Sequence, residues 1–105
     1  MLVGNTRLFL AAKALVTDEG DVRHRVALAC QILTKMHPSE LDEDLRSRLN
    51  DVINKAGRRG PLFGADGRVI RDRFDETIVH SRNSTYVKYA HEIFEIYQEE
   101  LGRHR

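Results

Sequence analysis

Residues 57–74, which read GRRGPLFGADGRVIRDRF, contain five arginines and four of the seven glycines of the chain. Guanidinium groups beside flexible backbone amides are suited to binding phosphate or carboxylate groups. This composition predicts that the segment, which lies in the connector before the last predicted helix, binds anions or nucleic acid. The candidate residues are Arg58, Arg59, Arg68, Arg71 and Arg73. The simpler interpretation is a solvated loop whose arginines pair with the acids of residues 39–56.

The chain does not contain the best-known phosphate-binding motifs. Neither GxxxxGK[ST] nor GxGxxG occurs in it, so nucleotide binding in those modes has no support. The aromatic residues are not interleaved with basic ones in a base-stacking pattern. Phosphate or nucleic-acid binding through the connector is therefore the alternative function and not the leading one.

A possible catalytic pair is formed by Arg73 and His80, in the segment RFDETIVH. The spacing resembles the Arg-x(4–6)-His signature of the HEPN ribonucleases, which are also all-helical. The resemblance implies that His80 acts as acid and base, and that Arg73 holds a phosphate at a dimer interface. Phe74 departs from the pattern, because a polar residue usually follows the arginine in that family.

Other reactive residue types are scattered along the chain. His91 and Glu95 are four residues apart and share one helical face, which can hold one edge of a metal site. No second pair at ligand spacing accompanies them, so we predict neither a metal nor a cofactor. Cys30, the single cysteine, lies in an apolar segment where cysteine behaves as a small hydrophobic residue. We therefore expect a protein that is not an enzyme.

The composition is that of an ordinary globular chain. Its 105 residues are 41% hydrophobic and 31% charged, with a net charge of +1. That length predicts one domain, residues 1–105. The near-neutral charge excludes a strong long-range attraction to nucleic acid or membranes. No apolar run approaches the roughly 20 residues that span a bilayer. We expect a soluble, cytoplasmic protein that does not bind membranes.

Apolar residues recur every three or four positions over about residues 5–16, 22–36, 40–56 and 84–101, which predicts four amphipathic helices. The expected fold is all-α: a four-helix up-down bundle with a long Gly/Arg-rich connector, residues 57–83, before the last helix. Asp66-Gly67 lies between two short apolar runs, which favours a small hairpin or an irregular loop in the connector. A short helix around residues 72–80 is also expected.

Two helices carry more apolar residues than one buried face needs. In the last helix, the face expected in the core consists of Val87, Ala90, Phe94, Tyr97 and Leu101, joined by Tyr86 and Ile93. Tyr89 and Ile96 lie beside it, and Val3, Leu10 and Ala14 form a second stripe on the first helix. These extra residues are either ordinary buried flanks or a surface for a protein partner or for a second copy.

The chain as a whole resembles a set of short uncharacterised bacterial proteins. The resemblance is carried by Leu15-Val16, by the segment GDVRHRV at residues 20–26, by the acidic ELDEDL at residues 40–45 and by Tyr89-Ala90. It implies a helical fold and no known activity. The leading hypothesis from the sequence is a non-enzymatic interaction or regulatory protein of the bacterial cytoplasm, which binds a protein partner or forms a homodimer.

Overall fold

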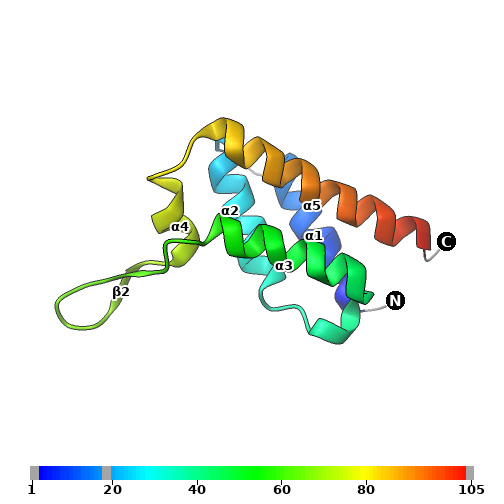
Figure 1. Ribbon diagram of the computed structural model, residues 1–105, viewed down its shortest axis with the longest axis horizontal. Helices are drawn as coiled ribbons and strands as arrows, with labels where there is room; N and C mark the ends of the chain where they lie inside the picture. Colours follow the sequence, from blue (N-terminus) through cyan, green and yellow to red (C-terminus); the bar gives the residue numbers. More distant parts are fainter. Residues whose placement is uncertain (1–2, 18–19, 104–105) are drawn as a thin grey trace.

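The computed structural model describes residues 3–17 and 20–103, with residues 3–6 and Pro38 described by their backbone alone. Most of this part of the chain is helical, which confirms the expected mainly-α class. Its elements, shown in Figure 1, are α1 (Val3–Thr17), α2 (Val22–Leu33), the 3₁₀ turn η1 (Pro38–Glu40), α3 (Glu43–Ala56), β1 (Leu62–Phe63), β2 (Val69–Arg71), α4 (Arg73–Ile78) and α5 (Asn83–Arg103).

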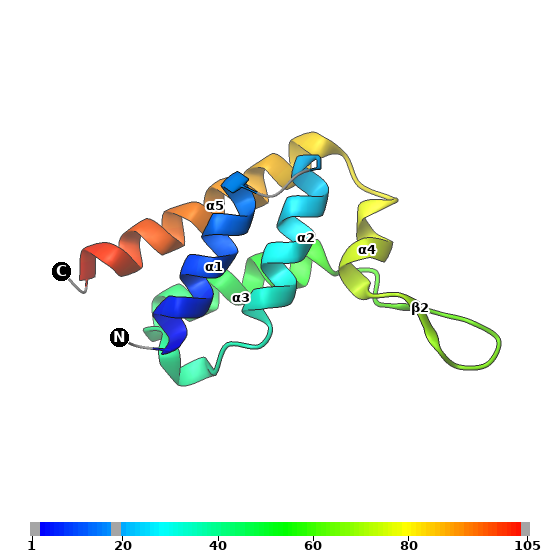
Figure 2. The same cartoon turned by 180° about the vertical axis from the view of Figure 1, so that it is seen from behind.

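The four longer helices enclose one core. α1 lies beside α2, and α5 runs along the ends of both while it also packs on α3 (Figure 2). The short α4 packs against α2 at one end of the molecule. Each of the four contributes apolar side chains that are almost completely buried, such as Leu8, Val26, Leu45 and Ile93.

Hydrogen bonds at the helix ends explain where the observed boundaries differ from the expected ones. α2 ends at Leu33 instead of residue 36, because Lys35 and Met36 donate to the carbonyls of Ile32 and Leu33 in a tightened turn. α3 begins at Glu43 instead of residue 40. The residues before it form η1, where the His37 and Glu40 side chains cap the turn reciprocally.

The buried face of α5 differs from the expected one. Val87, Phe94 and Leu101 were expected in the core, but they are exposed. Tyr86 and Ile93, which were expected to join that face, are fully buried. With Glu100 they lie one position before the exposed residues, and together with Ile96 they form the inner face. Both series repeat every seven residues, so periodicity alone does not distinguish them.

The connector contains the small hairpin that was one of its two expected forms. β1 and β2 are antiparallel, and Leu62 pairs with Arg71. The turn between them is closed by a hydrogen bond of 3.0 Å from the Gly67 amide to the Gly64 carbonyl. Gly67 has φ of 81°, a conformation that side chains disfavour. The hairpin projects beyond the helices (Figure 1), and its side chains are exposed.

Candidate functional site

A continuous apolar surface runs along α1 and α5. The Tyr97 ring joins the two helices, because its centroid lies 6.3 Å from that of Phe9 and 6.0 Å from that of Phe94. The members of this α1–α5 surface are Phe9 and Val16 of α1 with Val87, Phe94, Tyr97 and Leu101 of α5. All except the partly buried Tyr97 are between 37% and 69% exposed. Large apolar side chains that remain exposed together mark interaction sites.

A hollow of about 320 Å³ lies in the α1–α5 surface, where the end of α1 faces the first half of α5. It is lined by Leu15, Val16, Val22, Arg25, Val87, Ala90, His91 and Phe94. Six of these side chains are apolar, and the other two are an arginine and a histidine. The lining contains no carboxylate, so the polar groups that a ligand would meet there are nitrogen donors or an imidazole.

Arg25 is the charged group of this hollow. Its Nη1 donates to the Gly20 carbonyl at 3.1 Å, while its Nε is buried and has no hydrogen-bond partner among the described residues. A buried donor without an acceptor is unfavourable by about 1–3 kcal/mol.

The structure gives the predicted stripe residues different positions. Leu10 is exposed, whereas Ala14 and Ile96 are buried in the core, which agrees with the alternative that these two are ordinary buried flanks. Tyr89 is partly buried, with its ring 5.1 Å from that of Tyr86. The side chain of Val3 lies outside the described residues. The exposed apolar residues of α5 were assigned to the core by their periodicity, which hid this surface.

The connector arginines do not form one patch. Arg71 pairs with Glu76 at 3.0 Å, and Arg68 lies 3.5 Å from Asp66 on the hairpin. Arg59 contributes its backbone, because its amide donates to Thr77 Oγ1 at 3.1 Å. These contacts are local to residues 57–80.

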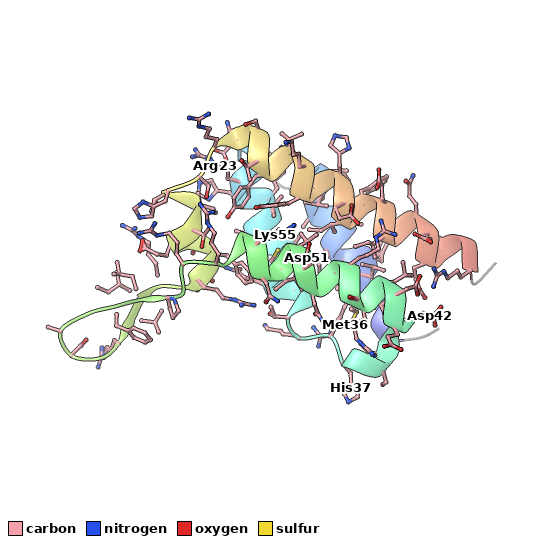
Figure 3. All side chains as sticks on the ribbon, viewed as in Figure 1. Arg23, Met36, His37, Asp42, Asp51 and Lys55 are labelled. Carbon is pink, nitrogen blue, oxygen red and sulfur yellow. The ribbon has the colours of Figure 1, made fainter. Side chains whose placement is uncertain are left out.

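The acids at the start of α3 have other partners than the connector. Arg103, at the end of α5, binds Asp42 at 2.9 Å and Asp44 at 2.6 Å. The hydrogen bond from Arg103 lowers the pKa of Asp44 to about 2. Figure 3 shows Asp42 at the start of α3 and Asp51 and Lys55 farther along it. The expected pairing of connector arginines with these acids is therefore not observed among the described ion pairs.

Arg73 and His80 have separate surroundings within one chain. The Arg73 guanidinium lies 4.8 Å from the centre of the Phe74 ring, and its stem packs so closely on Gly57 that a Cβ there would come within 2.8 Å of it. The His80 imidazole lies 3.9 Å from Glu76, on the exposed side. A ribonuclease site assembled from two copies stays a prediction.

Cys30 does not have the features of a nucleophile. It is fully buried, and this burial raises the pKa of its thiol to about 12, although the charge of Arg73 acts in the opposite direction. The reactive thiolate is therefore scarce at neutral pH. Among the described residues, no three His, Cys, Asp or Glu side chains are grouped so as to hold a metal ion.

A second hollow, of about 240 Å³, lies where the connector meets the start of α5. Its lining, which we call the basic hollow, is Arg58, His80, Ser81, Arg82, Thr85 and Tyr89. The sequence identified Arg58 and His80 as candidates separately. It did not identify Arg82 or Thr85, although an arginine directly before a helix start is a signal for an anion site.

Searches against protein-family models, curated proteins and solved structures find no match to this chain. In the described residues, no helix combines the length and the apolar character that crossing a membrane requires. Functional inference therefore rests on the two surfaces described above.

Proposed function

We propose that this protein is a non-enzymatic interaction module of the bacterial cytoplasm, in which four helices form an up-down bundle. Its α1–α5 surface binds an acidic amphipathic helix of a partner protein. The observation that carries this proposal is the exposed row of Val87, Phe94 and Leu101 beside Phe9 and Val16. A folded chain that leaves these side chains in water is stabilised when a partner covers them.

The spacing of the row supports a helical partner. Val87, Phe94 and Leu101 are seven residues apart, so they lie along one line of α5. A second helix that lies along this line buries its own apolar residues, at three- and four-residue intervals, against the α1–α5 surface. Phe94 is the central anchor, since it is the middle residue of the row and also lines the hollow.

The charges around the α1–α5 surface support an acidic partner. Arg25 and His91 line the hollow, and the exposed Lys13 lies between Phe9 and Val16 on the same side of α1. A carboxylate on the partner pairs with the Arg25 guanidinium, because Arg25 lines the hollow. A second copy of this chain is a less favourable occupant, because a symmetric dimer through this face brings the same cations together.

The proposal is tested with a synthetic helical peptide that carries leucine at heptad a and d positions and glutamate elsewhere. We expect fluorescence anisotropy to show saturable binding to the full chain. Phe94→Glu should weaken it by about tenfold or more, because it places a carboxylate among the partner's acids. Arg25→Gln should weaken it to a smaller degree.

Val69→Glu is the matched control, since it makes the same type of change at an exposed apolar residue of the hairpin. It should leave peptide binding unchanged. A version of the peptide with lysine in place of glutamate should bind much more weakly. Equal binding of both peptides, or equal loss in both variants, contradicts the proposed surface.

Sedimentation of the chain alone tests whether a second copy of the chain covers the α1–α5 surface. We expect a monomer for the wild type at micromolar concentration. A dimer that Phe94→Glu converts to a monomer would show that a second copy covers this surface, which overturns the acidic-helix proposal. A photo-crosslinker at Val87 in the native host, followed by mass spectrometry, should capture a segment with an acidic amphipathic pattern.

A further inference from the structure

The basic hollow has a rigid frame, although its charged side chains are exposed. The amide of Arg59, next to Arg58, donates to the buried Thr77 at 3.1 Å. Ser81 Oγ donates to the Thr77 carbonyl at 2.6 Å. A single buried threonine of α4 therefore fixes both sides of the hollow.

A further bond holds the start of α5 in place. Arg23 of α2 donates to the Ser81 carbonyl at 3.3 Å, and its other guanidinium nitrogen binds Asp21 at 3.0 Å. Figure 3 shows Arg23 where α2 meets the beginning of α5. The segment that carries His80 and Arg82 is thus also positioned by a contact from α2.

The two arginines of the hollow have no carboxylate partner among the described residues. None of the ion pairs among the described residues involves Arg58 or Arg82, and no acid lines the hollow. His80 lies 3.9 Å from Glu76, which also accepts a hydrogen bond of 3.0 Å from Arg71. Two guanidinium groups therefore line a hollow whose lining contains no carboxylate.

We propose that the basic hollow binds the phosphate group of a small ligand. Arg58 and Arg82 bind the phosphate oxygens with their guanidinium groups, and the hydroxyl of Thr85 donates a further hydrogen bond. The first amides of α5, which have no carbonyl partner within the helix, favour the same charge. The volume of about 240 Å³ is below the range typical of drug-sized ligands, so it suits a compact anion.

The test is a titration of the full chain with inorganic phosphate, followed by amide chemical shifts at constant ionic strength. We expect saturable shifts that are concentrated in residues 80–86. The double variant Arg58→Ala/Arg82→Ala should weaken binding by about tenfold or more, because it removes both charge-assisted contacts. Both residues are exposed, so the variant should retain the wild-type spectrum elsewhere.

Arg68→Ala is the control, because it removes one positive charge at an 88% exposed side chain on the hairpin. It should leave phosphate binding unchanged. Absence of saturable shifts at millimolar phosphate, or an equal loss in Arg68→Ala, contradicts the proposed site. Phe94→Glu should bind phosphate like the wild type, since this site does not depend on the α1–α5 surface.

A short single-stranded RNA is the second arm of the experiment. We expect it to bind no more tightly than inorganic phosphate. If RNA binds far more tightly, with a steep salt dependence, and Arg68→Ala and Arg71→Ala weaken it as well, an extended nucleic-acid surface replaces the small-ligand site. In that outcome the proposal is wrong.

Discussion

Tyr86 shows how one side chain fixes the packing of two helices. It is fully buried, and its hydroxyl donates to the carbonyl of Ala56, the last residue of α3, at 2.8 Å. That carbonyl has no partner within α3, as is usual at a helix end. The bond therefore fixes the start of α5 against the end of α3.

We expect Tyr86→Phe to lower the free energy of unfolding by about 1–2 kcal/mol, because it leaves the Ala56 carbonyl buried without a donor. Urea unfolding at neutral pH measures this change. Tyr97→Phe is the control, since Tyr97 is only partly buried and packs through its ring. It should change stability by less than about 0.5 kcal/mol. An equal effect in both variants contradicts the role of the hydroxyl.

The same variant has a distinct signature at high pH. Burial raises the pKa of Tyr86 from 10.0 to about 12, so the folded protein keeps a proton that the unfolded chain loses. This stabilisation is complete below pH 10 and is lost as the pH rises through 12. Wild-type stability should therefore fall more steeply above pH 10 than that of Tyr86→Phe. Cys30, with its raised pKa, adds a similar decline in both proteins.

At the scale of the element, the orientation of α5 decides which residues form the core and which form the proposed interface. Ion pairs with α3 stabilise the observed orientation: Arg48 binds Glu92 at 2.7 Å and Glu99 at 2.6 Å. Arg103 adds its bonds to Asp42 and Asp44 from the end of α5. These pairs are exposed and individually weak, but together they favour one register.

Replacing one side chain on the buried face of α5 and one on its exposed face with alanine tests this orientation. Ile96→Ala should lower the free energy of unfolding by about 2–5 kcal/mol, because Ile96 is fully buried. Leu101→Ala should lower it by less than about 1 kcal/mol, since nearly half of that side chain is exposed. Chemical unfolding measures both. A larger loss for Leu101→Ala would mean that the helix is rotated by one position.

A comparison of α3 with α5 shows when sequence periodicity is sufficient to predict which residues are buried. In α3, Leu45, Leu49, Val52 and Ile53 form one apolar stripe among polar residues, and all four are buried as expected. In α5 two heptad series are both mainly apolar, and the buried one includes Glu100. Tertiary contacts such as the bonds of Arg48 and Tyr86 favour the observed one. A sequence pattern contains no information about those bonds.

At the scale of the whole molecule, the hairpin is separate from the packed helices. Its apolar side chains remain in water, and its two strands contain only Leu62–Phe63 and Val69–Arg71. Asp66-Gly67 indicated either a hairpin or an irregular loop at this position, because the requirement of a tight turn is local. The basic hollow was not predictable in the same way, since Arg58 and Arg82 meet only through the folded chain.

We expect that residues 63–70 can be replaced by a short glycine-serine link with a change in stability of less than about 1 kcal/mol. The ends of this deletion are adjacent, because Leu62 and Arg71 pair across the ladder. Thermal unfolding measures the change, and phosphate binding at the basic hollow should be retained. Loss of cooperative unfolding would show that the hairpin contributes to the core.

The single thiol gives the chain an internal reporter of opening motions. Cys30 is enclosed by the helices, so an alkylating reagent reaches it only when α2 separates from its neighbours. Because no other cysteine competes for the reagent, the labelling rate reports that one event. A ligand that binds the closed form in either hollow should slow the labelling, so the rate can be used to screen mixtures of compounds or peptides for binding partners.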